Sequence, residues 1–549
     1  MKRLLNYLCI LFFFSISVSD SYSQKASFSV NQITASDLES YVTFLASPLL
    51  KGRMNGEDGL DIAAQYIASQ AKLLGLKPAN GNSFFQPYSI LKTTMDPEKT
   101  SINIVSNSKD TTIIKTPFYQ LIPTGPADLE LQGEVVFAGY GIRSTKYKYN
   151  DFENLNTEGK IILVMDRAPM SEDGKKSLFE EPYWHSSMSF QLKLMAMPNL
   201  KAKAILIVPD PKSGLASIGD SGQGFADQIS SKTSLSGEPE EKPNPIMAMM
   251  PKMIYIDRAL ADELLKGSGH TLEGLQKNID SSLKPNSFLI PGKQLIIKEV
   301  TRTDEKVLNN VAGFVEGSDP VLKNEVIVFS GHYDHIGGSG TRINAGADDD
   351  ASGCAALLSM AEAFQSLNKK PLRSILFLWV SGEEIGLFGS KSYVNKPLFP
   401  LDKTVADLNM DMIGRIKEAA DSTRDTPMTG PTSVFVITDY QSKELLAIAE
   451  AVDKKSMLDL DYSLSGKDHF LQLLRRSDHY NFVQKDIPVL FFSTGIHTDY
   501  HTPGDVIEKI DFKKMELVTR TMYEIGLTVA NRKTRLTVDN PFSAWGKSK

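Results

Sequence analysis

The sequence predicts an α/β protein in which a mostly parallel mixed sheet is flanked by helices, with an inserted β-rich module. After Pro291, short apolar runs and amphipathic runs alternate, which is typical of parallel strands joined by helices. Ser374–Val380 is almost continuously apolar, as in a strand that is covered on both faces. The chain of 549 residues is long enough for two or three domains.

Composition limits the class of protein. The chain is 41% hydrophobic and 23% charged, so it can bury a large core and is not of the disordered type. Lys and Arg number 60 against 66 Asp and Glu, which gives a net charge of −6. The sequence contains no basic run and no basic patch interleaved with aromatic residues, so we expect no nucleic-acid partner.

The first residues have the pattern of an export signal. Two basic residues precede a mostly apolar run, Leu4–Val18, and a short polar stretch follows it. We predict a signal peptide over residues 1–23, and hence a periplasmic or secreted protein without stable membrane association after cleavage. The alternative is a membrane anchor, but the apolar run is short for a span and contains Asn6. With Cys9 removed, Cys354 would be the single cysteine, and its place on a predicted helix indicates a core residue.

Periodicity places the other elements in chain order. Residues 24–120 are expected to form the first part of the α/β domain, with two amphipathic helices. Residues 121–290 are the inserted module, because short strands alternate there with long polar loops. Residues 295–532 are the main part of the α/β domain, and residues 533–549 are a polar tail. The elements expected in the main part are strands over 310–315, 326–330, 374–380, 405–411, 433–437 and 487–492, and helices over 352–367, 443–452 and 512–529.

Five groups of potential metal ligands stand at or after predicted strands. In parallel sheets the carboxyl ends of the strands meet at one edge, which is where binding sites form. We therefore expect these groups to lie together. They are His332 with Asp334, the run Asp348-Asp349-Asp350, Glu383 with Glu384, Asp411, and His501, for which His497 is a competitor.

Each group taken alone also has a plain structural explanation. His332 and Asp334 could be solvated loop residues, and the aspartate run could only cap a helix. Together they are mixed histidine and carboxylate donors, which suit Zn²⁺, with Co²⁺ or Mn²⁺ able to replace it. Of the adjacent Glu383 and Glu384, one can bind metal while the other acts as a general base. A pair of ions would serve the hydrolysis of an amide or an ester.

Two other hydrolase classes are disfavoured by the sequence. It contains no His-Glu-x-x-His motif, which mononuclear zinc peptidases use. It also contains no Gly-x-Ser-x-Gly motif, so a serine hydrolase is not expected.

The stretches around these donors resemble the co-catalytic zinc aminopeptidases of metallopeptidase family 28, typified by the bacterial leucyl aminopeptidases. The resemblance covers residues 33 to about 110 and 305–530, in the order of the family. It implies the zinc-exopeptidase fold, which is of the phosphorylase/hydrolase-like type. The matching stretches are Gly331–Gly337, Gly346–Gly353, Gly382–Ser390, Asn409–Arg415, Ser477–His479 and Tyr500–Asp505, with Leu49–Gly59 as a further match.

The family's site residues, carried to the matching positions, imply two Zn²⁺ ions. Asp334 would orient His332, and Glu383 would be the general base and acid. The peptide bond Asp348–Asp349 would be cis. The implied metal ligands are Asp348 as the bridge between both ions, His332 and Asp411 on one ion, and Glu384 and His501 on the other.

The inserted module, residues 121–290, resembles a protease-associated domain, which in the family overhangs the active site. The whole resemblance implies an exported dizinc aminopeptidase that removes N-terminal residues from peptide substrates, with a metal-bridging water activated by Glu383. Three alternatives stay open. They are a glutaminyl cyclase, a carboxypeptidase or dipeptidase on the same fold, and a non-catalytic binding module. The preferred residue at the cleavage position and the oligomeric state do not follow from the sequence.

Overall fold

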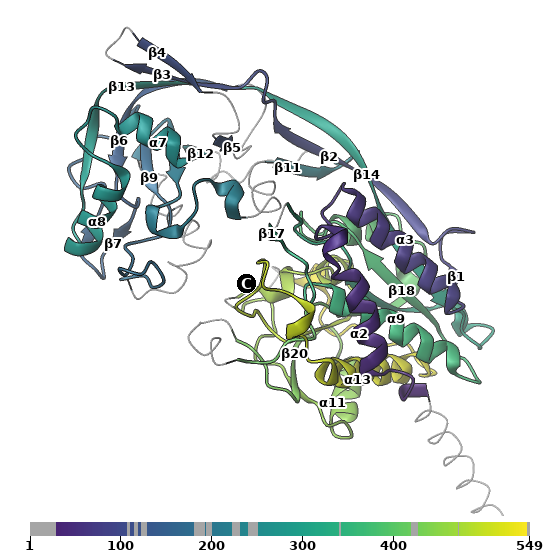
Figure 1. Cartoon of the computed structure of the whole chain (residues 1–549). Coiled ribbons are helices and arrows are strands. Elements are labelled where there is room, and N and C mark those ends of the chain that lie inside the picture. Colours follow the sequence, from purple (N-terminus) through teal and green to yellow (C-terminus); the bar gives the residue numbers. More distant parts are fainter. Residues whose placement is uncertain are drawn as a thin grey trace, which may run out of the picture. The chain divides into compact units, whose positions relative to one another are not determined.

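The chain folds into two compact units. One contains the residues up to Ser89 and from Val307 onward, and the other contains Ile90–Lys306 (Figure 1). The predicted signal peptide lies outside the described residues. The computed structural model describes residues 29–106, 110–114, 119–121, 129–179, 193, 200–221, 231–239, 251–339, 342–418, 427–469 and 471–545.

Two helices open the first unit. In α2 (Ala35–Leu45), the hydroxyl of Thr34 accepts the N–H of Asp37 and caps the N-terminus. Its buried residues recur at helical spacing, and α3 (Asp58–Leu73) buries a stripe of alanine and leucine in the same way. Both helices pack on α9 (Ala351–Ser366). The loop between them therefore lies against the part of the chain that leads into α9.

The first unit is built on a mixed sheet with a parallel centre. Its strand order is β2-β14-β18-β15-β19-β22-β20-β21, with β1 alongside β14. The central strands β18, β15, β19 and β22 run parallel, whereas β14 and β20 are antiparallel to their neighbours. The bounds are β1 Lys77–Pro78, β2 Phe85–Met95, β14 Thr301–Val315, β15 Val326–His332, β18 Ser374–Val380, β19 Thr404–Met410, β20 Ser433–Ile437, β21 Asp459–Asp461 and β22 Val489–Ser493.

Helices cover both faces of this sheet. On one face Phe329 and Phe377 pack on Phe364 of α9, which also contacts Tyr523 of α13 (Phe512–Ala530). The alternate strand residues cluster instead with residues of α10 (Phe388–Asn395) and α12 (His479–Val483). A further helix, α11 (Lys443–Asp453), packs on α13. The predicted α/β class, with a mostly parallel sheet between helices, is confirmed.

The second unit carries its own sheet and core. Four of its strands, β6, β9, β10 and β12, are parallel, and buried aliphatic residues line both faces. In addition, β11 (Ser231–Leu235) pairs with residues 90–94 of β2, which belong to this second unit. The strand order is β4 (Asp110–Ile114), β3 (Ser101–Ser106), β13 (Ser287–Glu299), β6 (Leu129–Ala138), β9 (Ile161–Met165), β10 (Ala204–Val208), β12 (Lys252–Ile256) and β5 (Tyr119–Leu121), with helices α7 (Arg258–Leu265) and α8 (Leu272–Ser282).

The unit boundaries differ from those expected from composition. The second unit begins at Ile90 and ends at Lys306, whereas the inserted module was expected over residues 121–290. The reason is strand pairing, since β3 and β4 precede residue 121 but join the sheet of the second unit through β13. In the expected polar tail, residues 533–549, two described side chains contact the first unit. Arg535 donates to the carbonyl of Thr404, and Phe542 packs on Tyr480.

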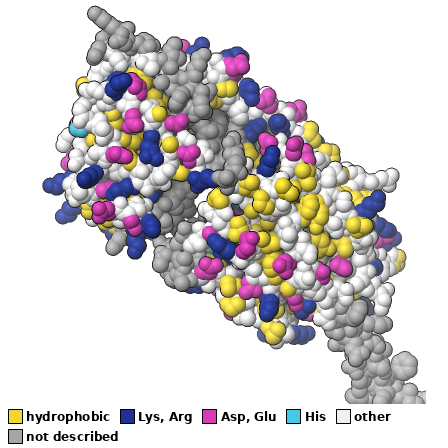
Figure 2. Space-filling view, viewed as in Figure 1, with side chains coloured by type: hydrophobic (Ala, Val, Ile, Leu, Met, Phe, Trp, Pro, Cys, Tyr) yellow, Lys and Arg dark blue, Asp and Glu magenta, His cyan; other side chains and the backbone are white. Residues whose placement is uncertain are grey.

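Two observations concern possible binding partners: the side chains on one face of the molecule, and the length and apolar character of the helices. On the face shown in Figure 2, side chains of Lys and Arg are interspersed with those of Asp and Glu, and apolar side chains gather over α2 and α3. Within the part of the chain that the structure describes, no helix has both the length and the apolar character needed to span a bilayer.

Candidate metal centre

Four adjacent parallel strands of the first unit end at the same edge of the sheet, and each is followed by a candidate ligand. His332 is the last residue of β15, and Asp411 directly follows β19. Glu384 comes shortly after β18, and His501 lies in the chain that follows β22. Asp349 stands just before the N-terminus of α9. The topology therefore brings these side chains to one place.

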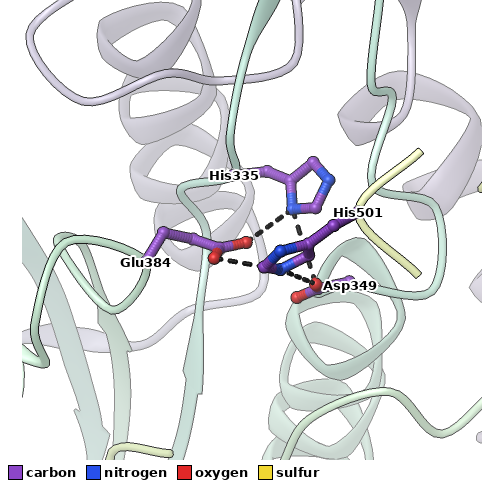
Figure 3. A group of neighbouring side chains, drawn as sticks. All are labelled: His335, Asp349, Glu384 and His501. Atoms are coloured by element: carbon purple, nitrogen blue, oxygen red, sulfur yellow. Dashed lines mark hydrogen bonds and ion pairs between the residues drawn. The ribbon is translucent and has the colours of Figure 1, made fainter. Parts of the chain in front are cut away.

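The convergent side chains form two groups. Within each group, the ligand atoms lie within 4.8 Å of one another. The His501 group contains His335, Asp349, Glu384 and His501, and the His332 group contains His332, Asp350 and Asp411. Figure 3 shows the His501 group, in which both imidazole rings are directed toward the two carboxylates.

Asp349 connects the two groups, because its two carboxylate oxygens face different histidines. Oδ1 lies 3.2 Å from Nε2 of His332, which is itself 3.5 Å from Oδ1 of Asp411. Oδ2 lies 3.2 Å from Nε2 of His501. That nitrogen is also 3.1 Å from Oε2 of Glu384. A carboxylate with one oxygen in each group is placed to bridge two cations.

Asp350 is a member of the His332 group, but its carboxylate oxygens accept hydrogen bonds from backbone N–H groups. Oδ1 accepts the N–H of Gly353 at 2.8 Å and that of Met412 at 3.3 Å. Oδ2 accepts the N–H of His332 at 3.2 Å. Asp350 therefore caps α9 and ties the end of β15 to the residues after β19.

The structure does not bring Asp348 to the bridging position that the motif implies, and places Asp349 there instead. Oδ1 of Asp348 accepts the N–H of Gly414 at 2.6 Å, and its own N–H donates to Asp505. The cis peptide bond is likewise one residue later than expected, between Asp349 and Asp350. Three consecutive aspartates look alike in the sequence, and only the path of the backbone distinguishes them. His497, the competitor of His501, contacts Asp348, with Nε2 at 3.5 Å from Oδ2, and lies in neither group.

The carboxylate of Asp334 holds the Glu383–Glu384 turn rather than the ring of His332. Its Oδ1 accepts the N–H of Glu383 and its Oδ2 that of Glu384, both at 3.2 Å. Asn55, from the loop between α2 and α3, donates to Oδ2 at 2.6 Å. Nδ1 of His332 lies 3.1 Å from the backbone carbonyl of Asp334, and the carboxylate is farther away, at 3.8 Å. Asp334 thus orients His332 through its main chain and both glutamates through its side chain.

Arg53, which the sequence motifs did not indicate as important, is fully buried beside the centre. Its guanidinium donates to the carbonyls of Tyr333 at 2.8 Å, Ala345 at 2.7 Å and Gly346 at 3.0 Å, and also to that of Leu45. One side chain therefore joins α2 to the loops that carry His332 and Asp349. Only arginine offers enough donors in a fixed plane for this arrangement.

The electrostatics of the His501 group are those of a cation site. Although burial would lower the pKa of His501, the carboxylates of Glu384 and Asp349 raise it to about 10. Although burial would raise the pKa of Glu384, the two histidines hold it at about 2. Buried atoms that face the groups, and that have no hydrogen-bond partner among the described residues, include Nε2 of His332, Oδ2 of Asp349 and Oδ1 of Asp411. Mixed nitrogen and oxygen donors of this kind fit Zn²⁺, so the residues present suit a metal centre.

A family model matches the part of the chain that carries this centre. Residues 310–526 match the model of peptidase family M28. They belong to that family. The M28 region contains both ligand groups, whereas Arg53 and Asn55 lie outside it.

Curated relatives match shorter segments. Aminopeptidase YwaD of Bacillus subtilis is 27% identical over 212 residues, which are 36% of this chain and 41% of the relative. Leupeptin-inactivating enzyme 1 of Streptomyces exfoliatus is 38% identical over 99 residues, which are 18% of this chain and 21% of the relative. The chain therefore spans less than half the length of these relatives.

Solved structures resemble a larger part of the chain and share the fold of the M28 region. A zinc aminopeptidase from Bacillus subtilis has a TM-score of 0.51 and 18% identity, and covers 92% of this chain and 97% of its own. An aminopeptidase from Aneurinibacillus sp. strain AM-1 has a TM-score of 0.50 and 19% identity, and covers 93% and 97%.

Proposed function

We propose that this chain is a dizinc aminopeptidase that hydrolyses the first peptide bond of its substrates. The observation that carries the proposal is the position of Asp349, which presents one carboxylate oxygen to His332 and the other to His501. A bridging carboxylate is the feature that a co-catalytic pair of ions needs. Membership of the M28 region in its family and the similarity to proteins named aminopeptidases support the choice of reaction.

One ion would be held by His332, Asp349 and Asp411, and the other by Asp349, Glu384 and His501. When bound, such ions would supply Lewis acidity to the scissile carbonyl and would acidify a bound water molecule. Asp334 keeps the ligand set in place, because its carboxylate fixes the backbone of Glu384 and its carbonyl fixes His332.

Glu383 is the group that moves the proton. Its N–H is bound by Asp334, while its carboxyl is not part of either ligand group. Burial, together with the carboxylates of Glu384, Asp411 and Asp478, raises the pKa of Glu383 well above its usual range, although His332 opposes the shift. A carboxylate with a raised pKa is a competent base near neutral pH. Glu383 would take the proton from the attacking water and donate it to the leaving amine.

The second unit and the first residues complete the proposal. We infer that the second unit is a protease-associated domain, on the resemblance of its strands and Gly-Tyr-Gly turn at residues 139–141. We infer export to the periplasm or the medium from the signal pattern of residues 1–23.

The test pairs metal content with activity. We expect the purified chain to hold two zinc ions and to hydrolyse aminoacyl-arylamides, with activity lost on chelation and restored by Zn²⁺ or Co²⁺. The same substrates with an acetylated amino group should not be cleaved. Hydrolysis only of blocked substrates or from the carboxyl end would contradict the proposal. Release of pyroglutamyl product by a protein with one ion would identify a glutaminyl cyclase instead.

A further inference from the structure

His335 stands in the His501 group although the five expected ligands do not include it. Its Nδ1 lies 2.8 Å from Oε1 of Glu384 and 3.6 Å from Oδ2 of Asp349. Nε2 of His501 lies 3.1 Å and 3.2 Å from oxygens of the same two carboxylates. Two imidazole nitrogens and two carboxylates thus face one another around one point, as Figure 3 shows.

The spacing of these atoms is that of a four-coordinate ion. Zinc binds nitrogen and oxygen at about 2.0–2.2 Å, so neighbouring ligand atoms of a tetrahedron lie about 3.3–3.6 Å apart. The contacts between the imidazole nitrogens and the carboxylate oxygens are 2.8 to 3.6 Å, although the two histidines face different oxygens of Glu384. One ligand atom from each of the four residues can be chosen so that all four lie within 4.8 Å of one another. A zinc ion therefore fits among them after small side-chain adjustments.

The surroundings hold His335 in this orientation. Its ring is buried, and its backbone N–H donates to the carbonyl of Arg53 at 3.2 Å. Gly346 packs on the ring so closely that a Cβ there would lie 2.7 Å from two ring carbons. The ring of His501 meets it edge-on at 5.6 Å. The imidazole is thus confined with Nδ1 directed at Glu384 and Asp349.

We propose that Nδ1 of His335 is a fourth protein ligand of one zinc ion, so that the two metal positions are unequal. The inference rests on the proposed dizinc centre and deepens it. Four protein ligands, His335, Asp349, Glu384 and His501, close the first position. The second position has three, His332, Asp349 and Asp411, and keeps a coordination site for water or substrate. Closed zinc sites are typically structural and open ones catalytic. The closed position binds its ion more tightly, and the open position exchanges its ion first.

The test is a metal titration of wild type and of His335→Gln, using a chromogenic chelator as competitor. Glutamine retains a side-chain N–H for Glu384 but removes the imidazole ligand, so it separates ligation from hydrogen bonding. We expect wild type to bind two ions with affinities at least about tenfold apart. His335→Gln should weaken the tighter ion by about 100-fold or more. The matched control is His497→Gln, since His497 is a buried histidine near the centre that belongs to neither group. It should keep both affinities.

A second variant keeps the proposal testable if His335→Gln does not fold. His332→Gln removes a ligand of the open position only, so it should retain one tightly bound ion. Loaded with Co²⁺, this variant should show the intense visible absorption of four-coordinate cobalt. Two wild-type affinities in His335→Gln, or a weak six-coordinate spectrum in His332→Gln, would overturn the proposal.

These outcomes are distinct from failure of the proposed function. A wild-type protein that binds two unequal ions but does not cleave aminoacyl-arylamides would contradict the aminopeptidase reaction and leave the role of His335 supported. A wild type that binds no ion would overturn both.

Discussion

Asn55 donates a hydrogen bond of 2.6 Å to the carboxylate of Asp334, 279 positions later in the chain. Asp334 in turn accepts the N–H groups of Glu383 and Glu384. The loop between α2 and α3 therefore reaches the proposed general base through a single intervening side chain. This loop lies outside residues 310–526, so the M28 region alone lacks part of the support for its own centre.

The hydrogen bond from Asn55 can be removed by Asn55→Ala. Because its acceptor is a buried carboxylate, we expect the free energy of unfolding to fall by about 1.5–3 kcal/mol. Metal affinity should fall about 10–100-fold, since Asp334 orients two ligands. Asn324→Ala is the control, because Asn324 donates to the carbonyl of Val321 at an exposed position. Equal small effects of both substitutions would show that Asn55 does not support the centre.

The assignment of the bridge to Asp349 can be tested against its neighbour. Asp349→Asn removes charge from both ligand groups and should lower the zinc content below one ion per chain. Asp348→Asn still accepts the N–H of Gly414 and should keep both ions. Zinc analysis of the two purified variants decides between them. Loss of zinc from Asp348→Asn but not from Asp349→Asn would restore Asp348 as the bridge.

Arg53→Lys keeps the positive charge but cannot reach the carbonyls that Arg53 joins. We expect the free energy of unfolding to fall by at least about 2 kcal/mol, because several buried carbonyls lose their donors. Urea denaturation provides the measurement. Arg520→Lys is matched to it, since Arg520 donates to a single carbonyl, that of Ile33, and is only part-buried. A loss for Arg53→Lys no larger than that for Arg520→Lys would contradict the structural role.

We expect His479 to contribute to the decrease in the free energy of unfolding as pH falls. Burial against Phe491 lowers the pKa of His479 to about 3. The folded-state pKa lies below the unfolded one, so the stability contribution is complete above pH 6.5 and is lost as pH falls toward 3. Between pH 7 and pH 5 this loss is about 2 kcal/mol. In metal-free protein, His479→Phe should reduce the decrease in unfolding free energy by that amount. An identical decrease in variant and wild type would show that His479 does not contribute to the pH dependence of stability.

Much of the fold could be predicted from the sequence. The apolar run Ser374–Val380 is a strand with those bounds, and the helix expected over 352–367 is observed at Ala351–Ser366. These elements are clear because burial on both faces, or on one stripe, leaves a strong pattern. The boundary of the second unit was not predictable, because the early strand β3 joins that unit by pairing with β13, more than 180 residues later. Amino-acid composition does not indicate which distant strands pair.

Four of the five expected ligands lie in the candidate centre, whereas Asp349, His335 and the supporting residues were not predicted. His332, Glu384, Asp411 and His501 follow strands, so topology alone brings them together. The choice among three adjacent aspartates depends on backbone direction, which a motif does not contain. His335 lies within the matching stretch, but its spacing does not show that its ring turns toward Glu384. Arg53 and Asn55 act on loops far away in the sequence. In the sequence, Arg53 and Asn55 lie in a glycine-bearing loop, residues 51–59, between two helices. That loop contains no pattern of metal ligands that would mark them as part of the centre.

The most direct test of the central claim is the zinc content and turnover of Glu383→Gln. The substitution removes the proposed base while leaving every proposed ligand in place. We expect two zinc ions per chain, as in wild type, and a kcat for aminoacyl-arylamides lower by about 10²–10⁴-fold. Turnover near that of wild type, with both ions bound, would contradict the account of Glu383 as the group that carries the proton.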